Sequence, residues 1–183
     1  MDGDGDLDIV SASMNDDTIA WYENNGAANP SFAAANIVTN ADAIEAVFVA
    51  DLDGDGDMDI LSASKNDDTI AWYENNGAAD PTFTKAVIAT SADGASDVFA
   101  ADIDGDGDMD IASSSQLDDT IAWYENDGAK DPMWTAADIA TTADGANGVF
   151  VVDIDGDGDL DILSSSFTDD TIAWYENQGA AGN

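Results

Sequence analysis

The chain has no cysteine and no histidine, and its only basic side chains are Lys65, Lys85 and Lys130. Without cysteine, disulfides contribute nothing to the fold, and the redox compartment cannot be read from cysteine pairing. The absence of cysteine and histidine also removes two of the side chains most often used as nucleophile or general base. The composition therefore narrows the catalytic options before any motif is considered.

The shortage of basic residues leaves a formal net charge of −37, because 40 residues are acidic. A surface this negative repels nucleic acid and anionic membranes, so neither is expected as a partner. The high charge suits salty surroundings, where dissolved ions screen the repulsion over short distances. No apolar run approaches membrane-spanning length, so no membrane insertion is expected, and Met1 leads into Asp2-Gly3-Asp4 without a signal peptide. The chain is nevertheless 44% hydrophobic, which excludes a disordered acidic tail.

The acidic residues concentrate in stretches such as Asp51–Ile60, in which aspartates alternate with glycine or an apolar residue. So much like charge in one turn requires neutralisation. Ca²⁺ suits it, because this cation takes about six to eight oxygen ligands in irregular geometry. With Asp51 at position 1, carboxylates fall at positions 3, 5 and 9, the backbone carbonyl of Asp57 at position 7, and Gly56 at the sharp turn of position 6. Ser62 stands where an EF-hand has its bidentate glutamate, so an EF-hand is excluded.

The same stretch recurs every 51 residues, as 102–111, 153–162 and, in shortened form, 1–9. One copy could equally be a solvated turn, but four copies in one register favour metal binding. The sequence therefore predicts three full Ca²⁺ sites and a fourth, incomplete and weaker site. The metal ligands predicted for the full sites are Asp51, Asp53, Asp55, Asp57, Asp59, Asp102, Asp104, Asp106, Asp108, Asp110, Asp153, Asp155, Asp157, Asp159 and Asp161. Those of the weaker site are Asp2, Asp4, Asp6 and Asp8.

Each 51-residue unit contains four short segments with strand character. In residues 44–94 these segments are Val47–Ala50, Met58–Ser64, Thr69–Tyr73 and Phe83–Thr90, separated by turn-forming residues. Four short strands per unit are typical of a β-propeller blade, and no segment keeps a helical period. The predicted fold class is all-β, with four-stranded antiparallel propeller blades and about 3.5 blades per chain.

The units form a single repeat array over residues 1–183. Their predicted bounds are 1–43, 44–94, 95–145 and 146–183. The first unit lacks its first strand and the last unit lacks its fourth, so the array has two open ends. These ends predict self-association into a homodimer or a larger ring, and an eight-bladed ring of two copies fits the strand order best. Met1 occupies the slot of Leu52, inside a metal loop, as expected for a piece cut from a longer secreted protein.

Loops of the form Asp-x-Asp-Gly-Asp-Gly-Asp-x-Asp in units of this length resemble the FG-GAP and VCBS-type repeats of integrin-like β-propellers. The resemblance covers the whole chain and implies that each loop binds Ca²⁺ between the two inner strands of a blade. It also implies a role in adhesion or glycan recognition. Ser62-Ala63-Ser64 stands where the family has Gly-Ala-Pro, and the Phe-Gly pair is absent, which favours the bacterial VCBS-like branch.

Aromatic residues repeat at two places in the unit. The first set could stack on sugar rings, but its position in a mid-sheet strand favours packing between sheets. This first set is Trp21, Trp72, Trp123 and Trp174. The second set is a better candidate for an exposed platform, although packing is again the simpler interpretation. It consists of Phe32, Phe83 and Trp134.

Two acidic features outside the loops have alternative interpretations. Asp16-Asp17 and its copies could hold a second cation, but a polar hairpin turn explains them better. Glu23 and its copies could form an acid/base pair with an aspartate. Such a pair needs two environments that separate the pKa values, and near-identical repeats offer one environment four times. The chain is therefore not expected to be an enzyme.

Two functions remain open from the sequence. The first is a calcium-binding repeat module of an extracellular or cell-surface protein, acting as a structural, adhesion or interaction scaffold with a protein or glycan ligand. The second is a calcium-dependent, lectin-like carbohydrate-binding module. A part of a polysaccharide-active enzyme is disfavoured. The extracellular location follows because many calcium modules outside cells work at ~10⁻⁴–10⁻³ M ligand.

Overall fold

The computed structural model describes residues 1–179 and contains fourteen strands in four antiparallel sheets, with no helix in that range. Sheet 1 consists of β1 (Ile9–Ser13), β2 (Thr18–Asn24) and β3 (Phe32–Val38). Sheet 2 consists of β4 (Ile44–Ala50), β5 (Asp59–Ser64), β6 (Thr69–Asn75) and β7 (Phe83–Ala89). Sheet 3 consists of β8 (Ala95–Ala101), β9 (Asp110–Ser115), β10 (Thr120–Asn126) and β11 (Trp134–Ala140). Sheet 4 consists of β12 (Ala146–Val152), β13 (Asp161–Ser166) and β14 (Thr171–Tyr175).

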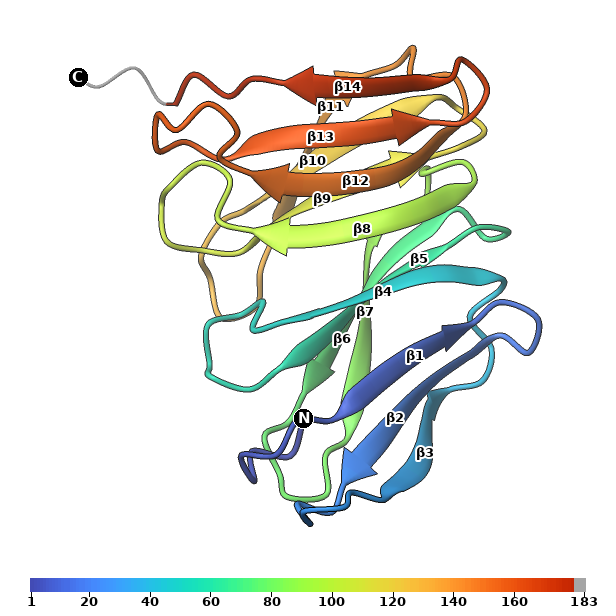
Figure 1. The fold of residues 1–183 in the computed structure, drawn as a ribbon, viewed down its shortest axis with the longest axis vertical. Helices are drawn as coiled ribbons and strands as arrows, with labels where there is room; N and C mark the ends of the chain where they lie inside the picture. The colour runs from blue at the N-terminus through green and yellow to red at the C-terminus, as the bar shows by residue number, and fades with distance from the viewer. Residues whose placement is uncertain (180–183) are drawn as a thin grey trace.

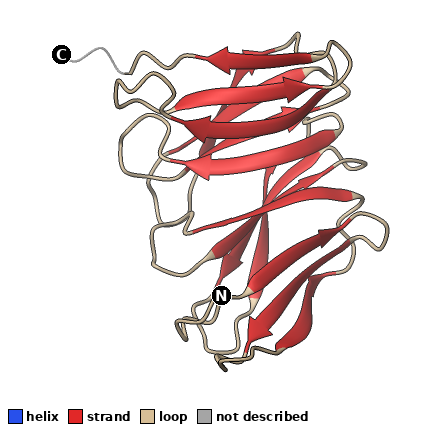
Figure 2. Ribbon diagram, in the orientation of Figure 1, coloured by secondary structure: helices blue, strands red, loops and turns tan. Residues whose placement is uncertain are grey.

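The four sheets follow one another in chain order along the long axis of the molecule, from the blue sheet 1 to the red sheet 4 (Figure 1). Within each sheet, neighbouring strands are consecutive in sequence, so every sheet is a simple meander (Figure 2). The all-β class and the repeated antiparallel sheets of three and four strands are confirmed. Over residues 1–179, the sheets form an open stack and do not close into a ring (Figure 1).

The first strand of each four-stranded sheet is longer than predicted. β4 begins at Ile44 instead of Val47, and β8 begins at Ala95 instead of Val98, the residue equivalent to Val47. Both starts pair with the end of the next strand across a register shift, between Ile44 and Ala46 in the first case. A bulge places one extra residue opposite its partner strand and breaks the alternation that marks a strand in sequence. The strand character of the first residues of β4 and β8 is therefore not recognisable from the sequence pattern.

Successive sheets pack face to face and bury one apolar cluster at each of the three junctions. Between sheets 2 and 3, Leu61, Ile70 and Trp72 of one sheet meet Ile111 and Tyr124 of the other. Alternate residues of each strand point to opposite faces, so a central sheet contributes to two clusters. The inner sheets are thus buried on both sides, whereas sheets 1 and 4 are each covered on one side only.

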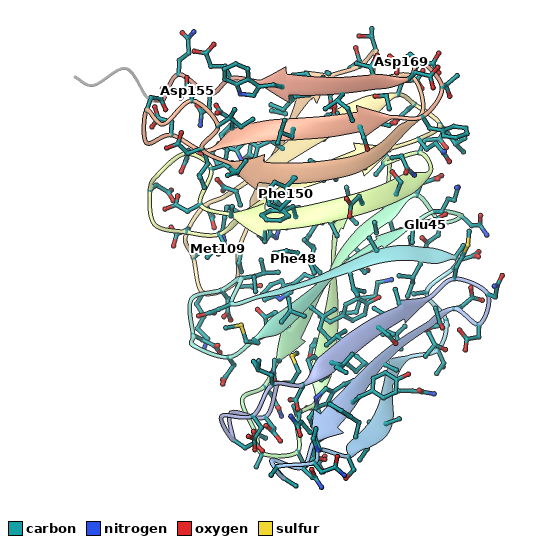
Figure 3. All side chains as sticks on the ribbon, in the orientation of Figure 1. Glu45, Phe48, Met109, Phe150, Asp155 and Asp169 are labelled. Carbon is teal, nitrogen blue, oxygen red and sulfur yellow. The ribbon has the colours of Figure 1, made fainter. Side chains whose placement is uncertain are left out.

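The first strands of sheets 2, 3 and 4 run close to one another, since β4 contacts β8 and β8 contacts β12. A row of phenylalanines marks this line. The ring centroids of Phe48 and Phe99 lie 4.6 Å apart, and those of Phe99 and Phe150 lie 4.9 Å apart. Figure 3 labels Phe48 and Phe150 at the two ends of the row. Such contacts favour tilted or edge-to-face geometry, as found here.

The Asp-Asp hairpin turns join two strands within a sheet, and they are hydrogen-bonded to the segment that leads to the next sheet. The second aspartate of each pair has a left-handed backbone, with φ of 55° at Asp17 and Asp68. Its Oδ1 accepts a hydrogen bond from a backbone N–H in the following inter-sheet connection, 3.0 Å from Ala43 N in the first case and 3.0 Å from Gly94 N in the second. Aspartate tolerates this conformation because its short side chain can bond to nearby backbone.

Candidate metal centre

The aspartate loops connect the first strand to the second strand in sheets 2, 3 and 4, and they lie at one end of those strands (Figure 3, where Asp155 marks the last loop). In the loop of sheet 2, Asp55 N donates to Asp53 Oδ1 over 3.2 Å, and Asp57 N donates to Asp55 Oδ1 over 3.0 Å. Gly56 N donates to Asp51 Oδ2 over 3.0 Å. These bonds fold the backbone into a tight loop. Gly56 has φ 96° there, a conformation that glycine adopts readily.

Carboxylate oxygens converge in each of these three loops. Within each group, one ligand atom per residue lies within 4.8 Å of the others. The groups are Asp51, Asp53 and Asp59; Asp102, Asp104 and Asp106; and Asp153, Asp155 and Asp161. Each group contains the aspartates predicted for loop positions 1 and 3, together with the aspartate of position 9 or 5. The structure therefore shows three acidic clusters that could hold a metal ion.

Within the described residues 1–179, several of these oxygens are buried without a hydrogen-bond partner. They are Asp51 Oδ1 and Asp53 Oδ2 in the loop of sheet 2, and Asp102 Oδ1 in the loop of sheet 3. A buried carboxylate oxygen without a donor is costly, and buried charges are paired or coordinate metals. The orphaned oxygens and the all-oxygen donor set fit a hard divalent cation, and they fit Ca²⁺ better than a cation that prefers nitrogen or sulfur.

The aspartate at position 9 anchors the loop to the sheet. Asp59 is 1% exposed; its Oδ2 accepts from Leu52 N over 3.1 Å and its Oδ1 from Asn75 N over 2.8 Å. Burial raises the pKa of Asp59 to about 6, against the lowering effect of those two hydrogen bonds. The indole N–H of Trp72 also lies near this carboxylate and lowers its pKa, although it makes no hydrogen bond of regular geometry.

The equivalent anchors differ between the loops. Burial raises the pKa of Asp110 to about 6, in the same way as at Asp59. At Asp161 burial also acts to raise the pKa, but hydrogen bonds from Asn177 and Ile154 outweigh it, so the pKa is lowered. Sheet 4 is covered on one side only, which leaves its loop more open to solvent. The anchor Asp161 therefore stays charged without a metal more readily than the inner anchors, whereas burial and the neighbouring carboxylates raise the pKa of Asp155 in the same loop.

Repulsion between the crowded loop carboxylates is seen in the pKa values of the aspartates at position 3. Burial and then the neighbouring carboxylates, chiefly Asp55 and Asp51, raise the pKa of Asp53, and only its hydrogen bond from Asp55 N opposes them. Glu74 adds to this repulsion, and sequence reasoning did not connect it with the loop. The pKa of Asp104 is raised for the same combination of reasons. A bound cation would remove the repulsion that these groups share.

The side chain at position 7 turns away from the cluster. The carboxylate of Asp57 lies against Gly77, where an added Cβ would collide with it. The same contact recurs in each repeat, between Asp6 and Gly26, Asp108 and Gly128, and Asp159 and Gly179. This placement agrees with the expected use of only the backbone carbonyl of Asp57. The glycine was missed in the sequence, although its recurrence 20 residues after the loop aspartate was visible.

The first loop has a different arrangement. Its turns are present, since Asp4 N donates to Asp2 Oδ1 over 3.2 Å and Asp6 N to Asp4 Oδ1 over 2.8 Å. Within residues 1–179, however, no group of three convergent carboxylates includes Asp2, Asp4, Asp6 or Asp8. The amino terminus of Met1 lies 2.7 Å from Asp8 Oδ2. Burial acts to raise the pKa of Asp8, but this ammonium group and the hydrogen bond from Asn24 N lower it overall.

The repeated tryptophans lie between the sheets wherever a following sheet covers them. Trp21 and Trp72 are buried, and Trp123 packs partly buried against the cluster between sheets 3 and 4. Trp174 is 45% exposed, on the uncovered side of sheet 4. Of the second aromatic set, Phe83 and Trp134 pack against core clusters, while Phe32 is 44% exposed.

The sequence profile of the FG-GAP-like repeat matches residues 1–62, 51–113 and 108–164. No curated protein matches the chain. Among solved structures, the chain is similar to the crystal structure of the V. cholerae biofilm matrix protein Bap1, with 22% identity and a TM-score of 0.47. That similarity covers 93% of this chain and 30% of the Bap1 chain.

Proposed function

The chain belongs to the FG-GAP-like repeat family, and from this premise we propose that it is a calcium-binding repeat module of an extracellular protein. In this role Ca²⁺ rigidifies a scaffold whose surfaces mediate adhesion or other interactions. The observation that carries the proposal is the convergence of buried, unpartnered carboxylate oxygens at Asp51 and Asp53. The same loop recurs at the same place in three sheets.

Each full site would be held by the aspartates at positions 1, 3, 5 and 9, with the backbone carbonyl at position 7. A bound Ca²⁺ supplies positive charge that offsets the crowded carboxylates and ties the loop to both strands that it connects. The protein's own part is to preorganise the loop. The hydrogen bonds from Leu52 N and Asn75 N to Asp59 hold the anchor in place. The backbone N–H bonds to Asp51, Asp53 and Asp55 orient the remaining carboxylates.

We further propose that the four sheets are blades of a β-propeller, with β4, β8 and β12 as inner strands. The close approach of these strands and the phenylalanine row along them support this arrangement. Loops at one end of the inner strands would then place the metal sites on one face of the propeller. We propose an extracellular location because calcium modules outside cells work at ~10⁻⁴–10⁻³ M ligand, the range expected for loops of this kind. No helix within residues 1–179 is long and apolar enough to cross a bilayer.

A scaffold fits the aromatic residues better than a carbohydrate-binding module does. A sugar platform needs a set of exposed rings, but Trp21 and Trp72 are buried between sheets. Trp174 and Phe32 are about half exposed, but they lie on the two opposite end sheets and do not form one platform. An enzymatic role is also disfavoured, because the acidic groups repeat one environment in every sheet and offer no distinct acid/base pair. The repeated elements therefore support packing and metal binding.

Isothermal titration calorimetry with Ca²⁺, after removal of metal with EDTA, tests the calcium proposal. We expect three sites of similar affinity, with the loop of residues 1–9 contributing weakly or not at all. Mg²⁺ should bind much more weakly, because it demands a smaller and nearly ideal octahedron. Titration of four equal sites, or no heat of binding at millimolar Ca²⁺, would contradict the proposal.

A matched pair of variants in one loop assigns the binding to particular side chains. Asp53→Asn removes one negative charge and leaves a single side-chain oxygen, which accepts from Asp55 N, so that an amide nitrogen takes the orphaned Oδ2 position. Binding at this site should therefore weaken strongly or be lost. Asp57→Asn makes the same change of charge four residues later, but its side chain faces Gly77 and its carbonyl remains available. It should retain three sites. Equal losses in both variants would indicate attraction by net charge alone.

A further inference from the structure

Every junction between sheets is closed by the same hydrogen bond. An asparagine at the end of the third strand of one repeat donates its Nδ2 to a backbone carbonyl in the aspartate loop of the preceding repeat. The pairs are Asn75 with Met1 O at 2.9 Å, Asn126 with Leu52 O at 3.0 Å, and Asn177 with Ile103 O at 2.8 Å. Partners in each pair are 74 residues apart. The junction is therefore one structural unit repeated three times.

The outer face of sheet 4 presents the aspartate-loop side of this junction, which contains the accepting carbonyl. Within residues 1–179, no further sheet supplies the donating asparagine. Ile172 is 76% exposed, whereas its equivalents Ile70 and Ile121 are 0% exposed. Ile154 is 43% exposed, whereas Ile103 in the preceding loop is 6% exposed. Phe150 and Trp174 are also about half exposed on this sheet. An apolar patch of this kind marks an interaction surface. We call it the tail face, defined by Phe150, Ile154, Ile172 and Trp174.

The outer face of sheet 1 carries the donor half. Ile9 is 48% exposed, whereas its equivalents Ile60 and Ile111 are 0% exposed. Within residues 1–179, Asn24 Nδ2 donates to Leu7 O over 3.0 Å but meets no carbonyl from another sheet. Its equivalents in the later repeats each make that second bond. Tyr22, which corresponds to the buried Tyr73, is only partly buried. We call this surface the head face, defined by Ile9, Tyr22 and Asn24.

We propose that the head face of a second copy of this chain docks on the tail face, in a head-to-tail contact that continues the internal stacking. Asn24 of the second copy would donate to Ile154 O, and Ile9 would cover the exposed side of sheet 4. A second copy is the partner that fits the tail face, because the same contact already joins sheets 1 and 2, sheets 2 and 3, and sheets 3 and 4 within one chain. This inference concerns the surfaces and does not rest on calcium binding.

A head-to-tail contact closes into a ring or continues as a filament. Propellers typically have about four to eight blades, so a ring of two copies, with four sheets each, stays within that range and a ring of three does not. The two seams of such a ring are equivalent by a two-fold axis. Because the chain carries a net charge of −37, repulsion opposes this contact, and added salt should strengthen it.

Light scattering coupled to size exclusion, at micromolar chain with calcium and 0.15 M NaCl, tests the proposal. The wild-type chain should elute at twice the monomer mass of 18.9 kDa. Ile172→Asp blocks the tail face and Ile9→Asp blocks the head face, and each should give a monomer. Met133→Asp is the matched control, because Met133 is 72% exposed but precedes β11 in sheet 3. This control should remain a dimer.

Mixing the two blocked variants separates a head-to-tail contact from a symmetric one. Ile9→Asp keeps an intact tail face and Ile172→Asp keeps an intact head face, so the mixture should recover the dimer mass. Circular dichroism of each variant checks folding, which both exposed positions should leave unchanged. A wild-type monomer at every salt concentration would overturn the proposal. So would a dimer of Ile172→Asp alone, or a dimer of Ile9→Asp alone formed through two tail faces.

Discussion

In the loop of sheet 2, the surroundings of each aspartate decide what its carboxylate can do. Asp53 leaves a buried oxygen without a partner, Asp57 rests against a glycine, and Asp59 accepts two backbone hydrogen bonds. Three residues of one type therefore serve as candidate metal ligand, spacer and anchor. The alternation of carboxylates in the sequence predicts the location of the site. The different roles of the three aspartates become visible only from their contacts in the folded chain.

Gly77→Ala tests the contact between the glycine and the position-7 carboxylate. Gly77 has φ +65°, and an added Cβ would displace Asp57. Gly54 has a similar φ of +72° but open space around its Cβ position, so Gly54→Ala is the control. A left-handed alanine costs about 1 kcal/mol in either case, and displacing the carboxylate should add about 1 kcal/mol more at Gly77. Urea unfolding in EDTA measures both, and equal losses would show that Asp57 moves aside freely.

Asp97 gives the chain a pH dependence that is independent of the metal loops. Burial raises its pKa, although its Oδ2 accepts from Val149 N over 3.0 Å and its Oδ1 from Val98 N over 3.0 Å. With a raised pKa, the folded state binds more protons than the unfolded state between pH 3.8 and the folded pKa. Stability contributed by this group is therefore present at low pH and lost as the pH rises through that window.

Asp97→Asn removes this titration, so the variant should gain stability relative to wild type as the pH rises from about 3 to 7. The other carboxylates titrate in both proteins and cancel in the difference. An asparagine accepts one of the two backbone N–H groups, which adds a loss that does not vary with pH. Denaturant unfolding at several pH values in EDTA gives the comparison. A difference that stays constant with pH would mean that Asp97 titrates normally.

At the scale of the strands, the end of each third strand joins its sheet to the previous loop. Asn126 is 2% exposed and donates both to Leu52 O and to Met109 O, while its Oδ1 accepts from Gly128 N. One side chain thus connects sheet 3 to the loop of sheet 2 and to its own loop. The strand itself extends to this asparagine, beyond the tyrosine at which the alternating pattern predicts its end.

Asn126→Ala should destabilise the chain by about 2–3 kcal/mol, because it leaves the buried carbonyl of Leu52 and the partly buried carbonyl of Met109 without this donor. Asp127→Ala is the neighbouring control. Asp127 is exposed, and it bonds only to Ala129 N and Met133 N within its own turn. Its removal should cost about 1 kcal/mol or less. Thermal unfolding of both variants measures the difference, and a similar loss in the two would argue against an inter-sheet role for Asn126.

At the scale of the whole molecule, the sequence predicts the repeated local elements. It does not predict the contacts that form only when sheets pack together. The 51-residue period, the aspartate loops and the strands around Ile70 and Trp72 follow from local patterns. The bond between Asn126 and Leu52 joins residues 74 apart, so no local pattern contains it. The early start of β4 was hidden for a related reason, since its bulged pairing with β5 breaks the alternation. Register and inter-sheet contacts are tertiary properties, and they appear only when neighbouring sheets are stacked.

Calcium should stabilise the molecule as a whole, because the loops of sheets 2 and 3 are hydrogen-bonded to the next sheet as well as joined to their own. A site at ten times its dissociation constant adds about 1.4 kcal/mol, so three such sites add about 4 kcal/mol. For a chain of this length that corresponds to a rise of about 10 °C in Tm. A thermal scan in 1 mM Ca²⁺ against EDTA measures it, with an equal concentration of Mg²⁺ as the control for screening of the −37 charge. Screening alone would raise Tm equally with both ions, whereas filling of the loops requires a larger rise with Ca²⁺ that Asp53→Asn reduces and Asp57→Asn does not.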